Sequence, residues 1–355
     1  MGIAEQWKTV ALMVVINFAF AVVNVLFKKV LDGGTNQMVI IIYRLAISAI
    51  FLGPIGYYRE RKSRTKLTGS ILCQLFFGAL IGLTLCQYLF LLGLKYTSAA
   101  FSCAFLNTVP VNTFLLAIPF GIEKVNLGSS GGRAKVLGAL ICMTGAILLS
   151  VYQGAPLTDS HSKYVTPDAE NSKKWVLGSI LLIGGCLSWS SWFLIQAHVL
   201  KSYPCQYSSI TILTFFASIQ TAILSLAIER DASMWILKGK LEILTIVYSG
   251  IVGSGLCYVG MSWCVKQKGP VFTAAFTPFT QIFAAMFDFS ILHEQLFVGS
   301  VIGSAIVVIG LYILLWGKSK EAADQCGVKQ IEPVIEEGVH HDDDPEAQVV
   351  KTTNT

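Results

Sequence analysis

Charged residues are scarce in this chain of 355 residues: they form 13% of it, whereas hydrophobic residues form 54%. Soluble globular domains carry about a quarter charged residues, so the composition excludes an ordinary soluble protein. Acids are almost absent from the long apolar runs, in which Asp288 is the only one. The near absence of charge from these runs indicates segments that lie in lipid.

The motifs of metal enzymes, redox proteins and nucleotide-driven pumps are also missing. The glycine-rich run Gly128–Arg133 lacks the Gly-Lys-Ser/Thr ending of a phosphate loop and follows an apolar run instead of a strand. The nine cysteines include no Cys-x-x-Cys pair, and most of them fall inside apolar runs. We therefore expect no enzyme activity, no cofactor and no metal site, and transport that is passive or coupled to an ion gradient.

Ten apolar runs approach the ~20 residues that a helix needs to cross a ~30 Å hydrocarbon layer. Because lipid offers no partners to backbone N–H and C=O groups, these runs should be helices. The sequence therefore predicts an all-α membrane protein with ten transmembrane helices. The runs cover residues of about 10–30, 38–58, 70–92, 99–121, 135–152, 176–199, 207–228, 243–264, 271–292 and 298–316.

The chain also matches itself. Residues 78–125 align without a gap with residues 249–296, and each copy places a Lys between two apolar runs and a Glu after the second run. Because each copy holds an odd number of runs, five, the second copy must enter the membrane from the opposite side. Two inverted five-helix repeats are typical of secondary transporters. The matches at an offset of 171 are Gly82/Gly253, Leu85/Leu256, Cys86/Cys257, Lys95/Lys266, Phe101/Phe272, Ala104/Ala275, Phe105/Phe276 and Glu123/Glu294.

We divide the chain into a first repeat over residues 8–152, a polar linker over 153–175, a second repeat over 176–317 and a disordered tail over 318–355. Lys and Arg are most frequent in the 59–69 loop, which the positive-inside rule places in the cytosol. Both termini are then cytosolic, and the linker lies on the opposite face. The net charge of +5 reflects these loops and not a nucleic-acid surface.

Polar side chains inside the apolar runs carry the functional signal, because a charge at the bilayer centre costs on the order of 3 kcal/mol and usually faces a cavity. Arg44 lies well inside the second run, where it can grip an anionic group or brace the bundle; Asn17 and Asn24 share a face of the first run. A single amide can simply join helices, but a set converging from several helices favours a polar cavity. The candidate substrate-binding residues are Arg44, Gln87, Asn107, Trp192, Gln196, Tyr258, Trp263, Thr277 and Gln281.

A proline and an amide recur together in the fourth and ninth runs. Under the offset of 171, Asn107-x-x-Pro110 lies over Pro278-x-x-Gln281, with the order exchanged. A proline inside a helix removes a backbone hydrogen bond, and the freed carbonyls are tolerated where they line a cavity or are covered by protein. We predict helix breaks at Pro110 and Pro278 and a substrate site beside Asn107 and Gln281. The alternative is an ordinary kink in which the amide bonds the freed backbone.

Glycine spacing predicts a close helix pair. Gly138 and Gly145 are seven residues apart in the fifth run, and Gly303 and Gly310 repeat this spacing in the tenth. Small residues on one face let helix backbones approach closely. We therefore expect these two helices to pack together.

Three stretches, Lys95–Ser102, Lys268–Phe276 and Gly310–Lys318, are more specific. They resemble the plant nodulin-like, walls-are-thin-related transporters (some are called UMAMIT proteins) of the EamA branch of the drug/metabolite transporter superfamily. The resemblance covers about residues 8–318 and implies ten helices in two EamA repeats. It also implies movement of amino acids or related organic metabolites, with auxin as another substrate of the family. The helix-one acid that small multidrug relatives use for proton exchange has no counterpart in the first or sixth run.

We interpret the chain as a multi-pass transporter that moves amino acids or related small organic metabolites across a plant membrane, as a facilitator working by alternating access. Export of auxin-like aromatic organic acids, which the tryptophans favour, is one alternative, and a non-transporting receptor or scaffold is another. The expected partners are a small-molecule substrate and the lipid bilayer, with no nucleic acid. The expected location is the plasma membrane rather than the vacuolar membrane.

Overall fold

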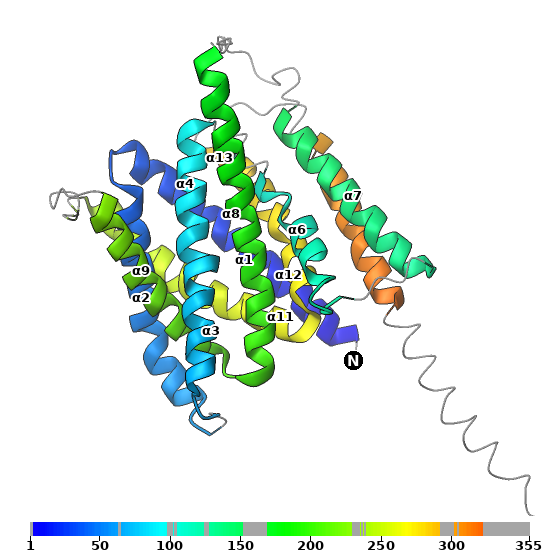
Figure 1. Cartoon of the computed structure of the whole chain (residues 1–355), viewed down its shortest axis with the longest axis horizontal. Coiled ribbons are helices and arrows are strands. Elements are labelled where there is room, and N and C mark those ends of the chain that lie inside the picture. The colour runs from blue at the N-terminus through cyan, green and yellow to red at the C-terminus, as the bar shows by residue number, and fades with distance from the viewer. Residues whose placement is uncertain are drawn as a thin grey trace, which may run out of the picture.

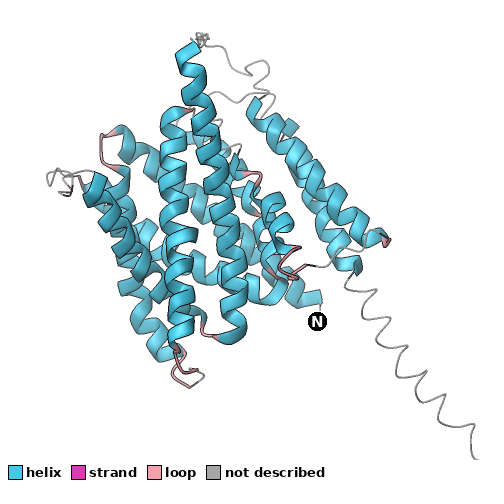
Figure 2. Cartoon of the chain, viewed as in Figure 1, coloured by secondary structure: helices cyan, strands magenta, loops and turns pink. Residues whose placement is uncertain are grey.

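The computed structural model describes residues 3–62, 65–97, 102, 105–123, 128–151, 169–228, 235, 237, 239–291, 302–303 and 305–321. Every regular element in these residues is helical, and the long helices run side by side in one bundle (Figures 1 and 2). The predicted all-α class is therefore confirmed.

The helices of the first half are α1 (Ile3–Asp32), α2 (Gln37–Arg59), α3 (Gly69–Ala79), α4 (Cys86–Tyr96), α6 (Val109–Ala117) and α7 (Ser130–Val151). Those of the second half are α8 (Ala169–Ser202), α9 (Gln206–Ile228), α10 (Lys240–Tyr248), α11 (Tyr258–Lys268), α12 (Pro270–Ala275) and α13 (Thr277–Ile291). A further helical segment at residues 305–321 is called the C-terminal helix here. Two π-helical segments, η1 (Leu80–Leu85) and η3 (Ser249–Cys257), join α3 to α4 and α10 to α11.

Six helical spans of the described residues are long and apolar enough to cross a membrane: Trp7–Leu31, Gln37–Arg59, Gly69–Tyr96, Lys173–Ser202, Gln206–Ile228 and Lys240–Lys268. They coincide with six of the ten predicted runs, so the chain is an integral, multi-pass membrane protein. The structure does not confirm the count of ten. One reason is that the fourth and ninth runs are divided into shorter helices, of which the longest, α13, has 15 residues.

Two helices extend beyond the apolar runs that predicted them. α8 begins at Ala169, inside the expected linker, and the C-terminal helix continues to Glu321, inside the expected tail. Ala, Glu and Lys, which are good helix formers, supply most of the added turns, so the helices can continue past the apolar segment. The remaining expectations for the linker and the tail fall at residues 152–168 and 322–355, outside the described residues.

π-helical turns occupy corresponding places in the two halves. Adding the offset of 171 to the bounds of η1, 80–85, gives 251–256, which lies inside η3. Close helix contacts require a glycine in η1, because a Cβ atom on Gly82 would lie 2.6 Å from the Cβ of Trp192. π-helical turns are rare. Their recurrence at one repeat position supports the internal repeat.

The two halves interlock instead of forming separate units. α2 packs along α9, α4 along α8, and α1 along α13 and η3, so each of these contacts joins one half to the other. One large core of buried side chains runs through both halves and includes Leu45, Trp192 and Phe276. A cavity inside this bundle is therefore built from both repeats.

α7 and the C-terminal helix lie side by side at one edge of the bundle (Figure 1). Their glycines face each other: a Cβ atom on Gly138 would lie 2.8 Å from the carbonyl oxygen of Gly310, and one on Gly145 would lie 3.0 Å from that of Gly303. Gly131 and Gly317 extend the same contact toward the end of the pair. The backbones thus approach at every glycine of the seven-residue spacing, as small residues allow.

Four charged side chains gather at one end of this helix pair. Lys135 of α7 and Lys318 of the C-terminal helix both pair with Glu123, which follows α6, and Lys135 also pairs with Glu321. The Nζ of Lys135 lies 3.2 Å from Oε2 of Glu123, and their side chains are only 6% and 10% exposed. Burial alone would raise the pKa of the Glu123 carboxyl, but Lys318 and Lys135 outweigh it and lower that pKa. This charge cluster ties the segment after α6 to two other helices.

Candidate functional site

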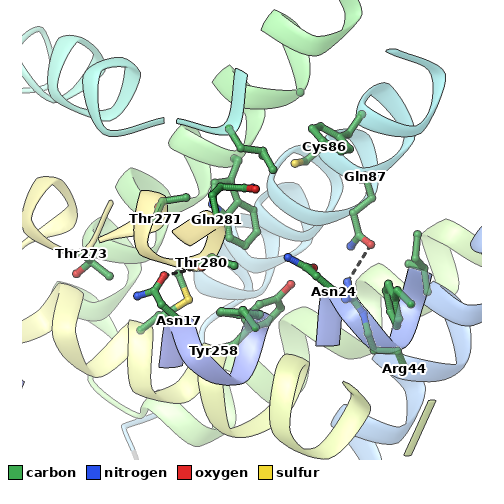
Figure 3. Close-up of a pocket in the computed structure, with 18 of the residues that line it drawn as sticks. Asn17, Asn24, Arg44, Cys86, Gln87, Tyr258, Thr273, Thr277, Thr280 and Gln281 are labelled. Atoms are coloured by element: carbon green, nitrogen blue, oxygen red, sulfur yellow. Dashed lines mark hydrogen bonds between the residues drawn. The ribbon is translucent and has the colours of Figure 1, made fainter. Parts of the chain in front are cut away.

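A cavity of about 240 Å³ lies between the two halves (Figure 3). α1, α2, α4 and Leu106 form its first-half walls, and α8, α11, α12 and α13 form its second-half walls. Transporter sites occur at such interfaces between repeats. The lining residues are Met13, Asn17, Phe20, Asn24, Phe27, Gln37, Ile41, Arg44, Cys86, Gln87, Phe90, Leu106, Gly185, Trp189, Tyr258, Met261, Thr273, Thr277, Thr280 and Gln281.

The π-helical turns position two of these residues. Tyr258 follows η3 directly and Gln87 is the second residue after η1, and the offset of 171 maps one onto the other. Both line the cavity. A π-helical turn shifts the register of the helix that follows it, and such turns often occur at functional sites. The repeat therefore brings an amide and a phenol from equivalent positions to one cavity.

Arg44 carries the only full charge among the described residues that line the cavity. Its Nη2 donates a hydrogen bond to Oε1 of Gln87 at 3.0 Å, and its guanidinium carbon lies 5.3 Å from the centre of the Phe27 ring. The Nε of Arg44 is buried and has no protein partner, and none of the ion pairs between described residues includes this guanidinium. A partly buried guanidinium with an unbonded Nε favours an anionic group as its missing partner.

Hydroxyl and amide groups form the opposite wall (Figure 3). Thr280 of α13 donates to Oδ1 of Asn17 at 2.7 Å, and Nδ2 of Asn17 donates to the Met13 carbonyl at 2.6 Å. These bonds make Asn17 a link between α1 and α13. Thr277 and Gln281 line the cavity beside this link. This wall presents neutral oxygen atoms opposite the charged Arg44.

An aromatic surface adjoins the polar groups. Trp189 lines the cavity and stacks on Trp192, with ring centres 5.2 Å apart and planes 11° from parallel. Tyr258 lies against both tryptophans, at 6.1 Å from Trp189 and 5.7 Å from Trp192. This cluster is large, rigid and largely buried, so it offers a flat apolar face to a substrate.

The structure brings five of the nine candidate residues together at the cavity: Arg44, Gln87, Tyr258, Thr277 and Gln281. Their role in binding stays a prediction. The other four lie outside the lining.

Each of these four has a place in the packing of the bundle. Trp192 is fully buried behind Trp189, and Gln196 donates to Ser262 at 2.8 Å between α8 and α11. Trp263 packs against the large core from a partly buried position. Asn107 is buried, and its Oδ1 has no described partner.

Several lining residues were not among the nine candidates. Asn17 and Asn24 share a helix face in the sequence, and that pattern could have included them. Trp189 lies three residues before Trp192 on the same helix and is the one of the two that reaches the cavity. Thr273 and Thr280 gave no signal, because threonines are common in membrane helices and only the fold shows which ones face inward.

Helix breaks occur beside both prolines. In the first half the chain leaves the helix at Asn107 and Thr108, and Pro110 then stands in the first turn of α6. In the second half the break is at Phe276, between α12 and α13, and Pro278 stands in the first turn of α13. Proline is well tolerated in a first turn, where its missing N–H is not needed.

The two breaks are covered or lie at the cavity. In the first half, Leu106 lies just before the break and lines the cavity. Just after the break, Oγ of Ser190 on α8 donates to the carbonyl of Val109 at 3.3 Å. In the second half, Thr273 and Thr277 lie on opposite sides of the break and both line the cavity. Irregular backbone at membrane depth is tolerated under these conditions.

Comparisons with known proteins agree with this architecture. The profile of the EamA-like transporter family matches residues 7–151 and again 176–316. WAT1-related proteins At3g30340 and At4g01440 of Arabidopsis thaliana are 52% and 51% identical to the chain, over 93% and 91% of it and 92% and 90% of their own length. A solved crystal structure covers 86% of the chain and 96% of its own, with a TM-score of 0.64. Its identity of 14% shows a shared fold alone.

Proposed function

Because the chain belongs to the EamA-like transporter family and is a membrane transporter, we propose that it moves amino acids or related small organic metabolites across a plant membrane. The observation that carries this proposal is the cavity between the two repeats, with Arg44 on one wall and neutral oxygen atoms on the other. The guanidinium binds the carboxylate of the substrate. Thr277, Thr280 and Gln281 bind its ammonium group.

The transport cycle is alternating access of this cavity to the two sides of the membrane. Interlocked repeats suit such a cycle, because a rocking motion of one half against the other opens the interface on one side and closes it on the opposite side. The binding residues come from both halves, so this motion also changes the distance between Arg44 and Gln281. The protein acts as a facilitator, and the substrate gradient sets the direction.

The topology comprises ten spans in two inverted repeats. The fourth, fifth, ninth and tenth runs add four spans to the six that length and apolarity already indicate. Arg59 ends α2, and Arg61 and Lys62 follow it. By the positive-inside rule these charges support a cytosolic position for that end of the bundle and for both termini. The membrane is the plasma membrane rather than the vacuolar membrane, which imaging of a tagged protein tests.

A second candidate substrate class is auxin-like aromatic organic acids. The stacked pair Trp189 and Trp192 favours it, because Trp189 presents an aromatic face to the cavity. Arg44 would bind the carboxylate of such an acid as well. The two classes differ in the ammonium group, which the hydroxyls of α13 would bind in an amino acid only.

Uptake by liposomes containing the purified protein tests both classes. Vesicles are loaded with an unlabelled amino acid, and uptake of the same labelled compound is compared with that of protein-free vesicles. We expect saturable uptake of amino acids and weaker uptake of an indole acid. Stronger uptake of the indole acid would support the second class, and no uptake of any organic acid or amino acid would refute the proposal.

A further inference from the structure

A second hollow lies on the outside of the bundle, away from the cavity between the repeats. It measures about 840 Å³ and is a groove over α8, with α3 on one side and α6 on the other. Figure 1 shows α8 between α3 and α6 in this order. None of its lining residues also lines the cavity described above.

Most of the groove is apolar and faces outward. Phe77 of α3 is 51% exposed and Phe120, after α6, is 72% exposed. Ile81, Leu194 and Ile195 continue the lining toward the middle of the helices. In a membrane protein such a surface is in contact with lipid chains.

Basic groups lie at one end of the groove only. His198 and Lys201 lie one turn apart on the last turns of α8, line the groove and are exposed. Ser70, in the first turn of α3, marks the same end. Arg61 and Lys62 lie in the loop that leads into α3 and add positive charge near this end. The apolar part therefore continues into a basic mouth at the membrane surface.

We propose that the groove binds an anionic phospholipid of the leaflet on the side of the 59–69 loop. One acyl chain lies along Phe77 and Ile195, and the headgroup phosphate pairs with Lys201 and with His198. Basic pockets between membrane helices at this depth suit phosphate headgroups. A zwitterionic lipid fits the apolar part equally well but gains less from the basic mouth.

Native mass spectrometry of the purified full chain tests the site. The detergent-solubilised protein is incubated with phosphatidylserine or phosphatidylcholine, and the number of retained lipids per chain is counted. We expect one phosphatidylserine to be retained in preference to phosphatidylcholine. Replacing His198 and Lys201 by Gln together should weaken phosphatidylserine retention about five-fold or more, because a single Lys near an anionic surface contributes about that factor. Equal retention of both lipids by the unaltered protein would overturn the proposal.

Two further variants distinguish binding in the groove from an effect of the overall charge of the protein on lipid retention. Lys173→Gln removes a charge from the exposed other end of α8 and should leave retention unchanged. Cys73→Trp fills the groove from an exposed position on α3 and should lower retention of both lipids. The site would be contradicted if Lys173→Gln lost phosphatidylserine retention, or if the His198/Lys201 variant retained phosphatidylserine as well as the unaltered protein. Displacement of the lipid by millimolar inorganic phosphate would show a simple anion site instead.

Discussion

Replacing Arg44 by Lys or by Ala separates its charge from its planar, two-pronged geometry. Lys keeps one positive charge but cannot hold a carboxylate through two parallel bonds, whereas Ala removes both the charge and the bond to Gln87. A hydrogen bond to a charged group contributes about 1.5–3 kcal/mol, and each 1.4 kcal/mol corresponds to a factor of about ten. We therefore expect Arg44→Lys to raise KM for amino acid uptake about ten-fold and Arg44→Ala to raise it roughly 10- to 100-fold.

The assay is uptake by proteoliposomes with equal amounts of inserted protein. Arg59 supplies a matched control on the same helix: its Nη1 donates to Tyr207 Oη at 2.7 Å, and its guanidinium lies 5.6 Å from the Tyr207 ring. Arg59→Ala thus removes similar contacts outside the cavity and should leave KM unchanged.

A substrate analogue with an amide in place of the carboxylate extends the test. This analogue should compete only weakly with the labelled amino acid for uptake by the unaltered protein. In Arg44→Ala, the amide and carboxylate forms should compete equally well. Normal KM in Arg44→Ala would refute the reasoning.

Four other results are expected. Gln281→Leu should raise KM for uptake, whereas Asn107→Leu should leave KM unchanged, since Gln281 lines the cavity and Asn107 is buried outside it; equal effects would contradict this difference. Gly138→Leu should lower the melting temperature because its side chain meets the backbone of Gly310, and Gly69→Ala, which meets nothing within 4 Å, should not. The lowered pKa of Glu123 means that its pairing stabilises the protein above the unfolded pKa of about 4.3 and is lost as pH falls through the folded pKa; Glu123→Gln should cost about 3 kcal/mol at pH 7 and flatten the acid side of a melting-temperature profile. Protease protection of tagged termini should find both in the cytosol, and opposite exposure would exclude ten spans.

Apolarity alone was enough to predict the long helices, because lipid leaves a spanning backbone no alternative to internal hydrogen bonds. The seven-residue spacing of Gly138 and Gly145, repeated by Gly303 and Gly310, also predicted a contact between distant segments, since small residues allow helix backbones to approach closely. The π-helical turns could not be predicted in this way. Gly82 and Gly253 mark them, but a glycine in an apolar run is equally compatible with a straight helix.

The orientation of each helix face explains which candidate residues line the cavity and which do not. Trp192 and Gln196 lie on the same stripe of α8 as Trp189. Trp189 lines the cavity, whereas Trp192 packs behind it and Gln196 contacts α11. Asn107 and Gln281 are the amides of two matching proline–amide pairs, but their order is exchanged, so Asn107 corresponds to Pro278 and Gln281 to Pro110. Of the two amides, only Gln281 lines the cavity. The two amides thus occupy different repeat positions, and the internal match alone does not determine which of them lines the cavity. Arg44 was the most direct signal, because a charged side chain inside a membrane helix usually faces the interior of the bundle or a cavity.

Binding of a labelled amino acid to the purified protein tests most directly whether the cavity between the repeats is the substrate site. Thr277→Trp fills this cavity from α13, and Ile180→Trp adds the same side chain on α8 at a position that is 59% exposed. We expect saturable binding by the unaltered protein and by Ile180→Trp, and none by Thr277→Trp when its melting temperature is unchanged. Saturable binding of unchanged affinity in Thr277→Trp would contradict this location of the site.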